Sequence, residues 1–110
     1  MRHWTLDEAT AALPEVRAKV QRLRALVRAR PTANGQAARL DTEIASIVEE
    51  LTADGIVVRD PERGLIDFPS LAPAGDTYLL CWLDGEDAID WWHWPDAGFA
   101  GRTPIDQPPT

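Results

Sequence analysis

The chain has a single cysteine and no long run of apolar residues among its 110 positions. A lone cysteine, Cys81, cannot form an internal disulfide, which is typical of proteins kept in a reducing compartment. The absence of about 20 consecutive apolar residues predicts that no segment spans a membrane. The N-terminal segment carries Asp7 and Glu8 where a secretory signal has an apolar stretch. We therefore expect a cytoplasmic protein with no membrane partner.

Two common signatures of chemistry are also missing. Zinc sites often show paired ligands at CxxC or HxxxH spacing, and the one cysteine and two histidines of this chain do not have that spacing. A phosphate-binding loop combines glycines with a lysine and a following helix, and the glycine-containing segment 97–102 has neither. We predict no catalytic residue, and the sequence favours neither a cofactor nor an enzyme.

Charge is divided unevenly along the chain, whose formal net charge is −7. Residues 1–40 hold eight basic and three acidic side chains, whereas residues 41–110 hold three basic and fifteen acidic ones. A basic stripe alone would suggest nucleic-acid binding, because neutralising phosphates releases counterions. The acidic half offers an internal partner for the basic half, so we expect no nucleic-acid partner. With 45% hydrophobic and 26% charged residues, the chain is predicted to fold as a single domain, 1–110.

Two apolar seams at helical spacing predict an antiparallel, coiled-coil-like helical hairpin over residues 5–30 and 36–54. A turn-forming cluster separates them at 31–35. The seams consist of Leu6, Ala9, Leu13, Val16, Val20, Leu23 and Val27, and of Ala37, Leu40, Ile44, Ile47 and Leu51. Basic residues flank the first seam and acidic residues flank the second: Arg17, Lys19 and Arg24 against Asp41, Glu43 and Glu50. Flanking charges select partners in coiled coils, so the two helices suit each other.

The ends of the helices carry recognisable signals. Thr5 and Glu8 have the spacing of a capping box at the start of the first helix. Pro14 lacks a backbone donor, so we expect a kink near Thr10 or a broken first turn. Gly55 is well placed to cap the end of the second helix.

After the second helix the pattern changes to that of short strands, and residues 56–94 are predicted to form an antiparallel meander of three to four strands. The expected strands are 56–59, 65–68, 77–83 and 89–94, the second ended by Pro69. Together with the hairpin they give an α+β fold. Alternate side chains share a face, so Tyr78, Leu80 and Trp82 lie opposite Leu79, Cys81 and Leu83. Both faces are apolar, which predicts a homodimer through the Trp82–Trp92–Trp94 face or the helical seam, or else an unknown protein partner.

Residues 95–110 are predicted to form a closing loop and a tail. Pro95 ends the last strand because it cannot donate to a ladder. Gly98 and Gly101 give the backbone freedom for a loop that closes over the sheet, and we expect Phe99 to be held in apolar surroundings. The tail is expected to be extended and frayed at its end.

Several segments carry motifs of a known family. They are Thr5 to Val16, Gly64-Leu65-Ile66-Asp67-Phe68-Pro69, Leu80-Cys81-Trp82, Trp92-His93 and Ala97 to Arg102. In these segments the chain resembles the prokaryotic proteins known as domain of unknown function 2203. The helical hairpin is matched only loosely, whereas the closing motif is fairly specific. The resemblance implies a small bacterial or archaeal cytoplasmic protein and supplies no activity.

The surroundings of His93 form the candidate site, and three interpretations are open. A metal site would use His93, Asp67 and Cys81, all of which are zinc-ligand types. A cysteine in the middle of a strand is otherwise a small buried hydrophobe with an inert thiol.

The second interpretation is a site for an anion or small ligand. It would use backbone amides at Gly98 and Gly101, the guanidinium of Arg102 and a wall of tryptophans. Its further members would be His93, Asp96 and Asp67.

The third interpretation is structural: His93 and Arg102 fasten the last loop to the sheet, with Arg102 paired to Asp67 or, as second choice, to Asp96. For the whole chain we predict a non-catalytic binding or protein-interaction module. The alternative is a small anion-, ligand- or metal-binding protein, or an enzyme, with its site at His93 and Arg102.

Overall fold

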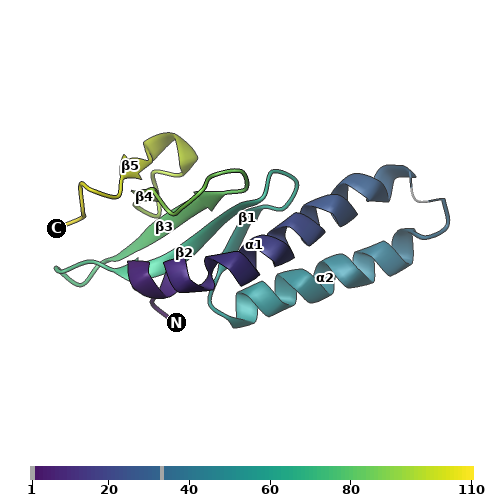
Figure 1. Ribbon diagram of the computed structural model, residues 1–110, viewed down its shortest axis with the longest axis horizontal. Coiled ribbons are helices and arrows are strands. Elements are labelled where there is room, and N and C mark those ends of the chain that lie inside the picture. Colours follow the sequence, from purple (N-terminus) through teal and green to yellow (C-terminus); the bar gives the residue numbers. More distant parts are fainter. Residues whose placement is uncertain (1, 33) are drawn as a thin grey trace.

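The computed structural model describes residues 2–32 and 34–110. Two antiparallel helices are followed by a five-stranded antiparallel sheet, so the fold is α+β. The helices form an elongated arm, and the N-terminal half of α1 (Leu6–Ala29) lies across the sheet (Figure 1). The molecule measures 51 × 25 × 24 Å because the far half of the arm extends beyond the sheet. In the part of the chain that the structure describes, no helix has the length and apolar character needed to cross a membrane.

The start of α1 has the capping box that the sequence predicts. The Thr5 side chain accepts a hydrogen bond from the Glu8 amide at 3.1 Å, and the Glu8 carboxylate accepts one from the Thr5 amide at 2.9 Å. The expected interruption at Pro14 is not a break, because α1 is continuous through it. Pro14 and Thr10 are both exposed, so water can reach the Thr10 carbonyl that lacks its helical donor.

The second helix, α2 (Ala37–Ala53), ends at a left-handed glycine, as predicted. Gly55 has φ +80°, and a Cβ on it would lie 2.8 Å from Cβ of Arg2, so the position requires glycine for both reasons. A short 3₁₀ turn, η1 (Arg30–Thr32), begins the connection between the two helices.

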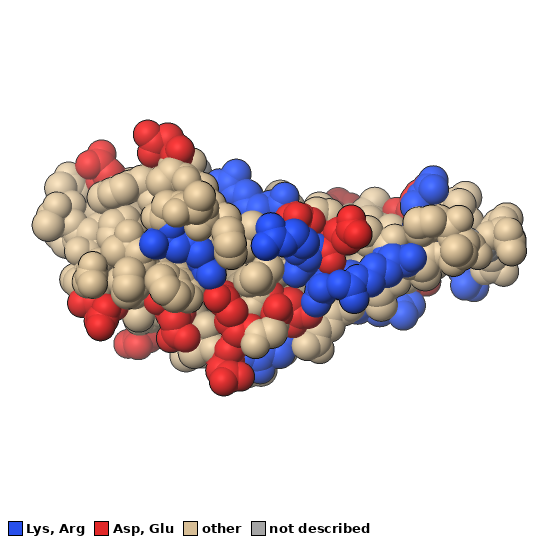
Figure 2. Space-filling model, turned by 90° about the horizontal axis from the view of Figure 1, so that it is seen from above, with Lys and Arg blue, Asp and Glu red and all other residues tan. Residues whose placement is uncertain are grey.

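Ion pairs between the helices use the acidic residues that the sequence singles out, with partly different basic partners. The pairs are Lys19–Glu50 at 3.8 Å, Arg22–Glu43 at 2.8 Å and Arg30–Asp41 at 2.7 Å. Arg17 and Arg24 instead reach the turn after β3, where they contact the Asp87 carbonyl and the Asp84 carboxylate. Basic and acidic side chains accordingly lie next to one another around the middle of the molecule (Figure 2).

The sheet has one strand more than expected. Its order follows the chain: β1 (Val57–Asp60), β2 (Leu65–Leu71), β3 (Thr77–Leu83), β4 (Trp91–His93) and β5 (Thr103–Pro104), each antiparallel to the next. The expectation that β2 ends at Pro69 is wrong. The Pro69 carbonyl accepts from the Trp4 amide, so the backbone at Pro69 faces away from β3 and the missing N–H costs no ladder bond.

The fifth strand comes from the tail, which is anchored where we expect it to be extended and frayed. Thr103 and Pro104 pair with Trp92 and Trp91. The Trp92 indole N–H donates to the Gln107 carbonyl at 2.9 Å, and Ile105 packs against the core. Burial of the Trp92 ring together with its polar N–H gives the tail a fixed position.

The core lies between the sheet and the helices. Phe68, Leu80 and Trp82 are fully buried and pack with residues of α1 such as Val16 and Val20. Trp82 and Trp92 are therefore buried in the chain's own core and Trp94 packs against it, partly buried, and most of the first helical seam is buried as well. Self-association stays a prediction, but these two surfaces are used within the chain.

Candidate functional site

Three neighbouring strands bring Asp67, Cys81 and His93 together on the sheet face that points away from the helices. Asp67 on β2 lies directly opposite Cys81 on β3, and His93 on β4 lies opposite Leu79, two residues along β3 from Cys81. The three side chains are 0%, 1% and 3% exposed. One ligand atom from each lies within 4.8 Å of the others. These three residues are the ligand candidates of the metal-site interpretation, one of the three that the sequence leaves open, and they lie together in the structure.

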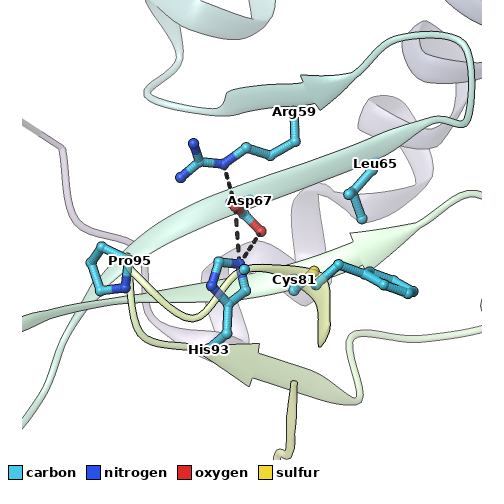
Figure 3. A pocket seen from close by; sticks show the side chains of 8 residues that line it. Arg59, Leu65, Asp67, Cys81, His93 and Pro95 are labelled. Atoms are coloured by element: carbon cyan, nitrogen blue, oxygen red, sulfur yellow. Dashed lines mark hydrogen bonds and ion pairs between the residues drawn. The ribbon is translucent and has the colours of Figure 1, made fainter. Parts of the chain in front are cut away.

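Asp67 is held by the guanidinium of Arg59 and the imidazole of His93. Arg59 Nε donates to Oδ2 at 2.7 Å, and His93 Nε2 lies 3.1 Å from both carboxylate oxygens (Figure 3). A fully buried carboxylate requires such partners, because burial without them is very costly. The expected partner of Asp67 was Arg102, and this pairing is wrong: Arg59 takes the position.

The ring of His93 has a defined orientation. Its Nδ1 lies 2.7 Å from the Trp94 carbonyl oxygen, and because a carbonyl only accepts hydrogen bonds, Nδ1 carries a proton. Nε2 then faces the Asp67 carboxylate, which accepts but does not donate when ionised. Nε2 is therefore the ring nitrogen directed into the site. Histidines that bind metals commonly donate their other N–H to a backbone carbonyl in this way.

The thiol of Cys81 is not a nucleophile in the metal-free protein. Burial, and then the negative charge of Asp67, raise the pKa of Cys81 to about 12. At neutral pH the side chain is therefore a protonated thiol, and the thiolate is the reactive form. A metal ion at the site would remove this proton at neutral pH, because coordination deprotonates a thiol.

Arg59 reaches the site from an irregular place in the edge strand. The pairing of β1 with β2 shifts in register between Val58 and Asp60, so Arg59 is the extra residue of a β-bulge. Its side chain is 44% exposed. Figure 3 shows Nε directed at Asp67 and the two terminal nitrogens pointing away from it. One end of this guanidinium therefore orients the carboxylate, while the other end is not used by it.

A pocket of about 200 Å³ opens above the three buried side chains. It is lined by Arg59, Leu65, Asp67, Cys81, His93, Pro95, Gly98 and Phe99. Gly98 has φ +64° and ψ −165°, a conformation open only to glycine, which turns the loop over the sheet as predicted. The sheet provides the floor of the pocket and the loop after β4 provides a wall.

Arg102 lies beside this pocket and is bound to a different carboxylate from either of those expected. Its two terminal nitrogens pair with Glu86 at 2.6 and 2.8 Å, and one of them also donates to the Cys81 carbonyl at 3.3 Å. Asp96, the second choice, is exposed and lines a separate open hollow with Trp94. The expectation of an Asp67 or Asp96 pair is therefore wrong, although Arg102 does fasten the last loop to the sheet.

Phe99 and Gly101 also differ from their expected roles. Phe99 is 39% exposed, and the guanidiniums of Arg63 and Arg102 lie 5.1 and 4.7 Å from its ring centre, so its surroundings are cationic, not apolar. Gly101 is exposed and does not line the pocket. A Cβ on it would lie 2.6 Å from Cβ of Ala97, so a close approach, and not a left-handed backbone, requires the glycine.

Two residues of the site region are absent from the expectations drawn from the sequence, namely Arg59 and Glu86. Alternation places Arg59 on the same face as Val57, and this signal is readable in the sequence. The pairing of Val57 with Asp67, which makes it the face of the aspartate, comes from the structure. Glu86 sits in the turn after β3, where it also accepts a hydrogen bond from the Leu83 amide. No periodic pattern predicts the partner of a turn residue.

Comparisons with known proteins bear on the family alone. No curated protein and no solved structure matches the chain. A family described as an uncharacterized conserved protein, DUF2203, matches residues 30–105, which is more than half of the chain. The match contains the segments at 64–69, 80–82, 92–93 and 97–102 and leaves Thr5 to Val16 outside. It also contains every residue that lines the pocket. The chain therefore belongs to the uncharacterized conserved protein family DUF2203.

Proposed function

We propose that the chain is a small metal-binding protein whose centre is formed by Asp67, Cys81 and His93. The observation that carries the proposal is the convergence of three buried ligand atoms, within 4.8 Å of one another, on the floor of an open pocket. Nitrogen, sulfur and oxygen donors together are typical of zinc sites. This function corresponds to the ligand-binding alternative drawn from the sequence and not to a protein-interaction module.

The spacing of the donors suits a zinc-sized ion after a small adjustment. Bonds of about 2.0–2.3 Å place the ligand atoms of a tetrahedral zinc ion roughly 3.3–3.8 Å apart. His93 Nε2 and the Asp67 oxygens are already 3.1 Å apart, and the widest separation in the set is within 4.8 Å. Side-chain rotations of about 1 Å would close the difference, without movement of the strands.

The hydrogen-bond partners of His93 and Asp67 also favour binding of an ion at this site. The Trp94 carbonyl holds Nδ1 of His93, which leaves Nε2 directed into the site, and Arg59 holds one oxygen of Asp67. Such outer contacts orient metal ligands and raise their affinity. The Asp67 carboxylate and a Cys81 thiolate would together balance the charge of a divalent ion.

Three protein ligands leave one position of a tetrahedral ion for water or a bound molecule. Structural zinc sites are usually closed by four protein ligands, whereas exchangeable and catalytic sites keep this position open. The open position would face the pocket, since the three ligands form its floor. A thiol ligand also suits the cytoplasmic location that we propose for this chain, because thiols stay reduced there.

Titration of untagged protein with Zn²⁺ and Co²⁺ tests the proposal. We expect one equivalent of either ion to bind, and the Co²⁺ form to show thiolate-to-cobalt charge-transfer absorption. Cys81→Ser removes the thiolate with little change in volume, so it should abolish that absorption and weaken binding by more than about 100-fold, the upper end of what outer-shell changes cost.

His3→Gln is the matched control, because His3 is exposed and bonds only to Thr77 in the described part of the chain. It should bind both ions as the wild type does. Circular dichroism checks that each variant is folded. A folded wild-type protein that binds neither ion would show that Asp67 and His93 form a purely structural pair. A Cys81→Ser variant that binds as tightly as the wild type would show that Cys81 is not a ligand and that the proposed three-ligand centre is wrong.

A further inference from the structure

We propose that the ligand of this site is a small oxyanion, a carboxylate or a phosphate, held jointly by the metal ion and by the terminal nitrogens of Arg59. The inference rests on the proposed metal centre and names the class of molecule that its open position takes. Four features of the pocket carry it: the free end of Arg59, the charge around the pocket, its walls and its size.

The first feature is that only one of the three nitrogens of the Arg59 side chain is bonded within the described part of the chain. Its Nε is used by Asp67, whereas neither terminal nitrogen has a hydrogen-bond partner among the described residues. Arg59 lines the pocket, and its terminal nitrogens point away from Asp67 (Figure 3). A planar pair of N–H donors beside a pocket is suited to two-bond recognition of carboxylate or phosphate.

The second feature is charge. Asp67 is the one carboxylate among the described residues that line the pocket, and it lies on the floor beneath Arg59. A divalent ion with the Asp67 carboxylate and a Cys81 thiolate has no net charge, so the Arg59 guanidinium leaves the loaded site with one positive charge. Arg63, against the Phe99 ring at the edge of the pocket, adds a second cation and has no ion pair among the described residues. Once loaded with a divalent ion, the pocket would therefore be locally positive in a chain of net charge −7.

The third and fourth features limit the ligand. Leu65, Pro95 and Phe99 provide apolar walls, which suit a short carbon chain or no chain at all. The pocket has a volume of about 200 Å³. Acetate, phosphate and other small oxyanions are of a size that this space accommodates.

The experiment adds sodium phosphate or sodium acetate to the Co²⁺-loaded protein and follows the cobalt spectrum, with sodium chloride at equal ionic strength as reference. We expect phosphate or acetate to shift the spectrum at a concentration where chloride does not. The two arms distinguish a phosphate ligand from a carboxylate ligand. Titration calorimetry with the same anions on Zn²⁺-loaded protein measures the affinity.

Arg59→Gln should weaken oxyanion binding by about tenfold or more, because two charge-assisted hydrogen bonds are lost. Arg59→Lys keeps the charge without the planar fork, so its affinity for the oxyanion should lie between those of the wild type and Arg59→Gln. Both variants are measured at saturating Co²⁺, verified by the charge-transfer band, since the loss of the Arg59 contact to Asp67 also weakens metal binding. Arg28→Gln, at an exposed position in α1, is the control and should bind as the wild type does.

The outcomes separate the two proposals. A protein that binds no Co²⁺ overturns the metal centre. A protein that binds Co²⁺ through Cys81 but responds alike to phosphate, acetate and chloride overturns only the oxyanion inference. Oxyanion binding that Arg59→Gln leaves unchanged, or that is as strong in the metal-free protein, would likewise contradict a site shared by the ion and Arg59.

Discussion

Arg102 and Glu86 form a two-bond ion pair that joins the loop after η2 (Phe99–Gly101) to the turn after β3. The nitrogen–oxygen distances are 2.6 and 2.8 Å, and the side chains are 11% and 22% exposed. The same guanidinium donates to the Cys81 carbonyl. The pair therefore ties the segment that closes the pocket to the strand that carries a proposed metal ligand.

We expect Arg102→Met to lower the free energy of unfolding by about 2–3 kcal/mol. Breaking a fully buried pair costs about 3–5 kcal/mol, and the loss is smaller here because water can reach the abandoned Glu86 carboxylate. Urea denaturation measures the change.

Arg22→Met serves as the comparison, because Arg22 and Glu43 form an ion pair of similar length whose side chains are 60% and 41% exposed. Its loss should cost less than about 1 kcal/mol. Equal losses in the two variants would mean that the Arg102 pair does not fasten the loop.

The helices are the part of the fold that the sequence predicts best. Their apolar spacing and end signals act locally, so 5–30 and 36–54 agree with Leu6–Ala29 and Ala37–Ala53 within one residue at each end. The expected kink at Pro14 does not follow from the residue type alone. The destabilisation that proline causes in a helix depends on whether water can reach the Thr10 carbonyl, and this is decided by the packing of the helix.

The fifth strand could not be predicted from local pattern. A pair of residues that includes Pro104 has no strand signature. It forms because the Trp92 indole binds the Gln107 carbonyl and Ile105 reaches the core, and both contacts depend on the path of the loop before it. Non-local contacts of this kind are decided by packing.

The candidate site, like the fold, has a part that the sequence predicts and a part that it does not. Asp67, Cys81 and His93 share a face through strand alternation and pairing of neighbouring strands, so their proximity follows from the sequence. The partner of Arg102 does not, because Glu86 lies in the turn after β3 and the path of the loop that turns at Gly98 decides this contact.

The buried thiol gives a prediction about pH. The pKa of Cys81 is raised by burial to about 12 in the folded protein, while a thiol in an unfolded chain has a pKa of about 8.5. Below about pH 8.5 both states are protonated and the full stability is present. As pH rises toward 12 the unfolded state alone loses the proton, so stability falls.

Cys81→Ala should therefore lose less stability than the wild type between about pH 9 and pH 11, measured by urea denaturation of metal-free protein. Other groups that titrate in this range are the same in both proteins and contribute equally to both curves. In the same protein, iodoacetamide should label Cys81 slowly at pH 8 and rapidly after unfolding, because the thiolate is the reactive form. Rapid labelling of the folded chain would contradict the buried thiol.

The last prediction separates two reasons for glycine in the closing loop. Gly101→Ala should destabilise the protein by about 1–3 kcal/mol, because the new Cβ would lie 2.6 Å from Cβ of Ala97 and the loop must move. Gly98→Ala should cost about as much for another reason: its surroundings are open, but φ +64° strains any residue with a side chain.

Ala97→Gly distinguishes the two causes. Combined with Gly101→Ala it removes the atom that clashes, so most of the lost stability should return, apart from up to about 1 kcal/mol for the added backbone freedom. Combined with Gly98→Ala it should restore nothing, because the strain there is in the backbone. Urea denaturation of the single and double variants measures both couplings. If Ala97→Gly rescued both variants equally, or neither, the assignment of steric contact to Gly101 and backbone conformation to Gly98 would be wrong.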